Sequence, residues 1–124
     1  MPQRLHLISA KEYIRSNVSG QLDLDGSMKL LREIAAAQAR SPDGDILLDV
    51  RAADGTDMSG LDIYELVILL RDLGLGRQNK VAILYQPKDD LDLGKLFEIL
   101  AQDRGLHVAA FQEFEPAYNW LITS

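Results

Sequence analysis

The sequence predicts an α/β fold: a single-layer, mixed, mostly parallel sheet of five strands with about four helices. Continuous apolar runs at residues 45–50 (DILLDV), 80–85 (KVAILY) and 107–111 (HVAAF) are typical of strands buried on both faces of a parallel sheet. Helical patterns separate these runs, and such alternation implies right-handed crossovers with helices packed on the sheet. Two earlier stretches, 4–9 and 13–20, alternate with period two and predict a hairpin near a sheet edge.

The hairpin is the first element along the chain. In its second strand Ile14, Ser16 and Val18 share one face, which indicates that only one face is well covered. We expect the turn at Lys11 and Glu12.

The first helix is expected from Asp25 onward, where the pattern changes to a helical period. Good helix formers fill residues 28–40, and either Asp25 or Ser27 is the expected cap. The turn residues SPDG at 41–44 then end the helix. The central strand that follows is expected to end at Asp49.

Three further helices are predicted. Residues 59–73 are apolar on most sides, and residues 90–104 are amphipathic. The last helix follows Glu115, with Pro116 at its first position and Trp120 turned inward.

Bulk properties limit the class of protein. A chain of 124 residues is expected to form a single domain over residues 1–124. The net charge of −6 and the scattered basic residues argue against nucleic acid as a partner. There is no cysteine, no apolar segment long enough to span a membrane and no secretory signal pattern, so we expect a cytoplasmic protein that is not transmembrane.

No motif indicates catalysis. The GLGRQN stretch at Gly74–Asn79 lacks a third glycine, and no phosphate-binding GxxxxGK sequence is present. An EF-hand centred on Gly55 would need an acidic residue where Val50 stands. His6 and His107 are both expected to have structural roles at strand positions. We therefore expect no catalytic, cofactor-binding or metal-binding residues, and no enzymatic activity.

One polar loop leads directly into the most apolar helix, in the stretch TDMSGLDIYELVILL at Thr56–Leu70. Ser59 is a good N-cap, which needs no further function. The same position would also favour a phosphate, because free N–H groups and the helix dipole attract negative charge. The neighbouring Asp54, Asp57 and Asp62 would repel that charge. The residues alone leave both interpretations open.

The run LLDV…DMSGLDIYELVILL resembles the STAS domain, the fold of anti-sigma-factor antagonists and of the cytoplasmic tails of sulfate transporters. Asp49 and Asp57 are eight residues apart, as in the family. VSGQLD at Val18–Asp23 and the closing RGLHVAAFQEFEPAYNWL resemble further parts of it. The resemblance covers most of residues 12–122 and implies a STAS-like fold.

The resemblance places Ser59 on the residue that a partner kinase phosphorylates in the antagonists. Met58 replaces a hydroxyl residue of the family, and Ala53–Thr56 is polar where the family is usually apolar. The end of the chain also resembles small stand-alone bacterial relatives of the STAS and Sec14-like lipid-binding group, which often lack the switch. The residues expected to contact a partner around Ser59 are Asp49, Asp54, Thr56, Asp57, Met58, Gly60 and Asp62.

Three functional hypotheses follow. The first is a non-catalytic regulatory module that binds a protein, such as a serine kinase or anti-sigma factor, through Asp54–Asp62 and the next helix. The second is a carrier of a small apolar ligand or lipid, with a pocket between Leu93–Leu100 and Trp120. The third and weakest is an enzyme that uses the aspartate-rich loop with a divalent metal.

Overall fold

The structure is a computed structural model, and it describes residues 3–8, 13–40, 44–55, 57–87 and 92–123. The elements in chain order are β1 (Gln3–Ile8), β2 (Tyr13–Gln21), α1 (Leu24–Gln38), β3 (Asp45–Asp54), α2 (Gly60–Asp72), β4 (Val81–Leu84), α3 (Leu93–Gln102), β5 (Val108–Phe111) and α4 (Phe114–Ile122).

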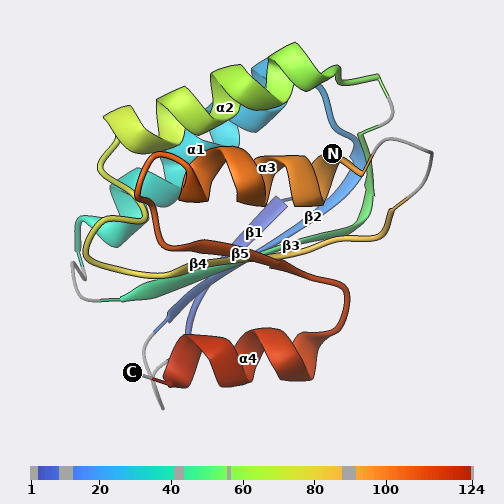
Figure 1. The fold of residues 1–124 in the computed structure, drawn as a ribbon. Helices are drawn as coiled ribbons and strands as arrows, with labels where there is room; N and C mark the ends of the chain where they lie inside the picture. The colour runs from blue at the N-terminus through green and yellow to red at the C-terminus, as the bar shows by residue number, and fades with distance from the viewer. Residues whose placement is uncertain (1–2, 9–12, 41–43, 56, 88–91, 124) are drawn as a thin grey trace.

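One sheet with the strand order β1-β2-β3-β4-β5 runs through the molecule. Its parallel part comprises four strands, β2 to β5, and β1 adds to β2 in the antiparallel direction. Helices α1, α2 and α3 cover one face, and α4 covers the other (Figure 1). The predicted α/β class, the parallel sheet and the four helices are therefore confirmed, with the helices distributed over both faces.

The sheet divides the core into two apolar clusters. Ile46 and Leu48 of β3 point into the larger cluster, which fills the space under α1, α2 and α3. Leu47, between them in sequence, points into the smaller cluster against Ala117 and Leu121 of α4. Because successive side chains of a strand point to opposite faces, a strand that serves both clusters must be apolar at every position. This requirement explains the continuous apolar run from which the strand was predicted.

The start of α1 differs from the prediction. Asp23 is the N-cap, and its side chain accepts a hydrogen bond from the backbone N–H of Gly26 at 2.8 Å. Asp25 and Ser27, the expected caps, lie inside the helix, which begins at Leu24. Asp23, two positions before Asp25, is an equally good capping residue, so the composition of the region did not fix the exact start of the helix.

Two other boundaries also differ. Helix α4 begins at Phe114, so Pro116 is its third residue instead of its first; proline is tolerated there because the first-turn N–H groups lack partners within the helix. Helix α3 spans Leu93–Gln102 with Asp92 as N-cap, a shorter helix than predicted. The expected turn at residues 11–12 and most of the turn at 41–44 lie outside the described residues.

The free edge of β5 is covered by side chains of α3. Glu98 Oε2 accepts a hydrogen bond from the backbone N–H of Ala110 at 2.8 Å. Gln102 Nε2 donates to the carbonyl of Val108 at 2.9 Å. Lys95 pairs with the other carboxylate oxygen of Glu98 at 2.6 Å. Backbone groups that a further strand would need are thereby occupied, which protects an edge from pairing with another chain.

Ser16 is fully buried in β2, and within the described part of the chain its hydroxyl has no hydrogen-bond partner. Replacing Ser16 with alanine should therefore raise the free energy of unfolding by about 1 kcal/mol, because it removes an uncompensated buried polar group. Urea denaturation measures the change. Ser27→Ala is the matched control: Ser27 is also buried, but its hydroxyl donates to Met58 Sδ at 3.7 Å. Equal destabilisation by both substitutions would contradict the prediction.

Candidate functional site

Ser59 begins α2 in a reciprocal capping arrangement. Its Oγ accepts a hydrogen bond from the backbone N–H of Asp62 at 3.1 Å, and Asp62 Oδ2 accepts one from the backbone N–H of Ser59 at 3.0 Å. The side chain of Ser59 is exposed at the carboxyl edge of the sheet. The expected capping role is present, and the hydroxyl remains accessible from solvent.

Just before Ser59, the backbone N–H of Met58 donates to the carbonyl of Gly55 at 2.9 Å. Asp57 is exposed, and its carboxylate accepts a hydrogen bond from Gln21 Nε2 at 2.9 Å. Asp54 is the last residue of β3, and Thr56 lies outside the described residues. Gly60 is the first residue of α2 and lies beside Leu96 of α3.

Met58 is buried and belongs to the larger core cluster, so it does not lie on the surface where a partner would contact the loop. Its sulfur accepts the hydroxyl of Ser27 on α1. A thioether suits this place because it is apolar and adapts to irregular gaps. The replacement of a hydroxyl residue by Met58 is therefore explained by core packing.

Asp49 is not a loop residue, because β3 continues past it to Asp54. Its carboxylate lies on the α4 face of the sheet, the face of Leu47, whereas α2 packs on the opposite face. Arg51 binds it with two side-chain bonds, Nε to Oδ1 at 3.0 Å and NH2 to Oδ2 at 2.8 Å. Arg15 of β2 adds a bond to Oδ2 at 3.2 Å. The structure thus separates Asp49 from Ser59.

The pKa of Asp49 follows from these contacts. Burial raises the pKa of the carboxyl, but the hydrogen bonds from Arg51, its charge and the bond from Arg15 together outweigh burial and hold the pKa below the usual aspartate value. The bond to Asp49 in turn raises the pKa of Arg51. A carboxyl with a lowered folded-state pKa stabilises the fold above its unfolded pKa, and this contribution disappears as the pH falls through the folded value.

We therefore expect Asp49→Asn to lower the free energy of unfolding at neutral pH, because it removes the ion pairs with Arg15 and Arg51. The loss should be only about 1 kcal/mol, because water screens the partly exposed arginines. The difference from the unchanged protein should shrink as the pH falls below about 4. Denaturation at a series of pH values measures it. Asp72→Asn removes an exposed carboxylate paired with Arg71 and serves as the control. A difference that stays constant down to acidic pH would refute the expected linkage.

A cavity of about 160 Å³ lies between the sheet and the three helices α1, α2 and α3, beside the Ser59 loop. Its walls are mostly aliphatic and include Leu30, Leu48, Met58, Ile83 and Phe97. The second functional hypothesis placed Trp120 at such a pocket, but Trp120 packs in the α4 cluster on the other side of the sheet. Leu93 and Phe97 of α3 do line the cavity, in agreement with the other half of that expectation.

Tyr85 closes one wall of this cavity at the end of β4. Its hydroxyl bonds to Asp92 Oδ2 at 3.1 Å, while Asp92 Oδ1 caps α3 through the backbone N–H of Lys95. Burial and the bond to Asp92 raise the pKa of Tyr85. The ring lies flat against Gly94, where a Cβ atom would be only 2.6 Å from ring carbons. Glycine at position 94 therefore allows α3 to approach the ring.

The aspartates of the loop do not form a metal site in the part of the chain that the structure describes, where no three acidic or histidine side chains are grouped to hold an ion. In the same residues, no helix combines the length and apolar character needed to cross a bilayer.

The sequence interpretation missed Arg15, Arg51 and Tyr85. Arg15 could have been found from the alternation of β2, which puts it on the face opposite Ile14 and Ser16. Arg51 has the same two-residue spacing from Asp49, but the strand was predicted to end before it.

Comparisons with known proteins show the fold. No protein-family model matches the sequence, and no curated protein is significantly similar to it. A solved structure that is similar is an uncharacterized protein of the DUF3478 family from Shewanella loihica PV-4, described as having a SpoIIAA-like fold. The identity is 18%, the alignment covers 97% of this chain and 92% of that one, and the TM-score is 0.54. The chain therefore has a SpoIIAA-like fold of the STAS type, as the sequence resemblance indicated.

Proposed function

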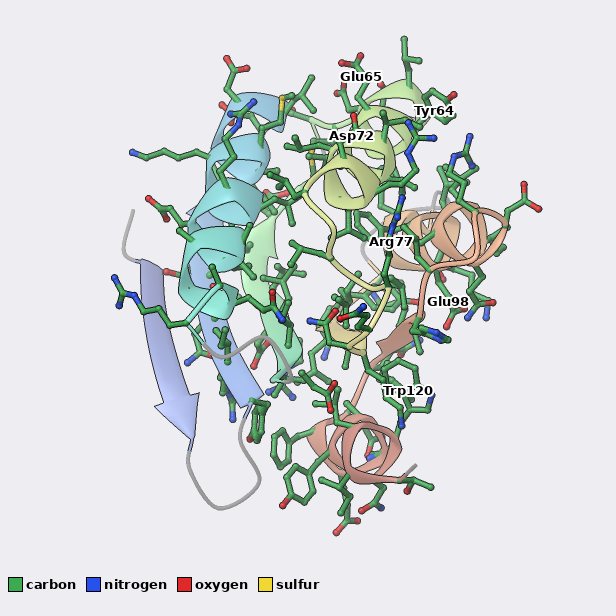
Figure 2. The ribbon with its side chains drawn as sticks, turned by 90° about the vertical axis from the view of Figure 1, so that its left-hand side faces the viewer. Tyr64, Glu65, Asp72, Arg77, Glu98 and Trp120 are labelled. Carbon is green, nitrogen blue, oxygen red and sulfur yellow. The ribbon has the colours of Figure 1, made fainter. Side chains whose placement is uncertain are left out.

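We propose that the chain is a non-catalytic regulatory module that binds a protein partner through the surface around the start of α2, and that Ser59 is a phosphorylation site within this surface. The observation that supports the proposal is the exposure of large apolar side chains. Leu61 and Tyr64 of α2 are 67% and 40% exposed, and Ile99 of the adjacent α3 is 54% exposed. Figure 2 shows Tyr64 and Glu65 on the outer side of α2.

The charges around this surface indicate the chemistry of the partner. Asp57, Asp62 and Glu65 are close to Leu61 in the chain and make the start of α2 acidic, while Arg104 lies over the ring of Tyr64, 4.9 Å from its centroid. A partner with an apolar contact and basic side chains around it would be complementary. Phosphate on Ser59 would add negative charge and further acceptor oxygens beside the N–H groups of the first turn, where Asp62 N–H now donates to Ser59 Oγ, so it would change the electric field of this surface.

The test uses affinity capture from native cells, followed by a direct binding measurement with the recovered partner. We expect Leu61→Asp to weaken binding at least tenfold. Ile122→Asp is the control, because Ile122 is as exposed as Tyr64 but lies on α4, on the opposite face. Equal loss of affinity in both variants, or none in Leu61→Asp, would reject the surface.

Phosphorylation is tested separately. Ser59→Asp should leave stability nearly unchanged, since aspartate caps as well as serine, and should change partner affinity if phosphorylation is regulatory. Phosphopeptide mass spectrometry on protein from native cells should find phosphate on Ser59. Full coverage of the peptide without phosphate, across growth and stress conditions, would reject the switch and leave the binding surface untouched.

The cavity favours a second candidate function, the binding of a small apolar ligand. Its volume is close to that of an apolar protein cavity that accepts a benzene-sized molecule. Extraction and mass spectrometry of the purified protein should recover such a ligand. Ala53→Leu would fill part of the cavity from β3 and should abolish retention, and a protein that yields no ligand from native cells would argue against this function.

A further inference from the structure

A second polar surface lies on the other side of the sheet from Ser59. Arg15 and Asn17 of β2 and Asp49 and Arg51 of β3 lie on the same face of the sheet as Tyr13 and Leu47, whose side chains pack toward α4. Helix α4 packs against β3, β4 and β5. The side chains of Arg15 and Arg51 remain 27% and 33% exposed, whereas that of Asp49 is 11% exposed. The two cations therefore reach solvent above a nearly buried anion.

The arginines have hydrogen-bonding capacity left for a ligand. Arg15 donates from Nε to Asn17 Oδ1 at 3.0 Å and from NH2 to Asp49. Arg51 donates from Nε and NH2 to the two Asp49 oxygens. These contacts account for two of the five N–H groups of each guanidinium. The remaining N–H groups can be offered to an acceptor that approaches from solvent.

The two guanidinium groups are also close together and fixed in place. Their NH2 atoms lie 3.2 and 2.8 Å from the same Asp49 oxygen, so one small anion can contact both. Arg15 lies over the ring of Phe114, 5.1 Å from its centroid, which restrains the guanidinium further. Ordering two long side chains normally opposes binding, and here the ordering is already present before a ligand arrives.

The local charge is positive although the chain carries a net charge of −6. One arginine would neutralise Asp49, and the second leaves a surplus positive charge. Paired planar guanidinium groups match the oxygens of a phosphate better than point charges do.

We propose that Arg15, Asn17 and Arg51 form a binding site for a phosphate group, carried by a small phosphomonoester or by a lipid headgroup. Asp49 is a positioning residue in this site: it holds both arginines from below and does not contact the ligand. The site is independent of the Ser59 surface, since it lies on the opposite face of the sheet.

The experiment follows the Nε–Hε NMR signals of the arginines while inorganic phosphate or glycerol 3-phosphate is added, with chloride at the same ionic strength as the reference. The Arg15 and Arg51 signals should shift and saturate. Arg51→Lys keeps the charge and should weaken phosphate binding several-fold, and Arg51→Gln should weaken it at least tenfold. Arg71→Gln, which removes an exposed arginine of α2, should leave the affinity unchanged.

A second arm identifies the source of the phosphate. Sedimentation with phosphatidylcholine vesicles, with and without phosphatidic acid, tests a lipid headgroup. Binding only to the phosphatidic acid vesicles, lost in Arg51→Gln, would assign the site to a headgroup, and a response to glycerol 3-phosphate alone would assign it to a soluble ligand. No response in either arm, or the same response in Arg51→Gln as in the unchanged protein, would overturn the proposal.

Discussion

Replacing Gly94 with alanine should lower the free energy of unfolding by about 2 kcal/mol or more, although alanine is the better helix former. The added Cβ atom would lie 2.6 Å from the ring carbons of Tyr85, which is too close for any real contact. Tyr85 is buried and its hydroxyl is held by Asp92, so neither the ring nor the start of α3 can yield without loss. Overpacking of this kind usually costs 1–3 kcal/mol, roughly.

Gly60→Ala is the matched control, because Gly60 also lies in the first turn of a helix. An added Cβ would be 3.5 Å from Leu96 Cδ2, an ordinary contact, so this variant should gain up to about 1 kcal/mol. In a Tyr85→Ala background the penalty of Gly94→Ala should largely vanish, which a double-mutant cycle measures. Gly94→Ala with unchanged stability would show that the ring moves freely away from α3.

Truncating Leu121 to alanine should cost about 2–4 kcal/mol, because Leu121 is almost fully buried between α4 and the sheet. The neighbouring Trp120 should cost less when truncated. It is only half-buried, and its ring lies 5.8 Å from that of Phe111 and 5.3 Å from the ammonium of Lys80. Burial, and not side-chain size, thus decides the order of the two effects.

Denaturation monitored by circular dichroism compares the variants, since truncation of Trp120 removes the fluorescent probe. Lys80 also donates to the carbonyls of Trp120 and Thr123 at the end of α4. Lys80→Met should therefore destabilise the end of α4 whether it is combined with Trp120→Ala or with Leu121→Ala. A Trp120→Ala variant less stable than Leu121→Ala would show that the indole carries the contact between α4 and the sheet.

The fold could be predicted because the local sequence of each core strand is enough to identify it as a buried strand. The apolar runs of β3, β4 and β5 reflect burial on both faces, and the helices between them have a clear period. The end of β3 could not be predicted for a physical reason. Strand β4 ends at Leu84, opposite Asp49, so beyond Asp49 the register of β3 continues with β2 alone. After Asp49 the sequence of β3 mixes polar and apolar residues, so it no longer shows the continuous apolar run that identifies a buried strand.

The candidate site was predictable where its contacts are local. The capping of Ser59 involves Asp62, three residues away, and can be read from the spacing alone. The surroundings of Asp49 could not be read in the same way. Arg15 lies 34 residues earlier, and only the pairing of β2 with β3 brings the two side chains together. Strand register is a property of the tertiary fold, which one sequence does not display.

The covering of the β5 edge by Glu98 and Gln102 has a consequence for synthesis on the ribosome. Both side chains belong to α3, which precedes β5 in the chain and therefore emerges before it. When β5 docks beside β4, the groups that close its outer edge have already been made. During synthesis, the outer edge of β5 therefore need not be exposed in a completed sheet, where it could pair with strands of neighbouring polypeptides.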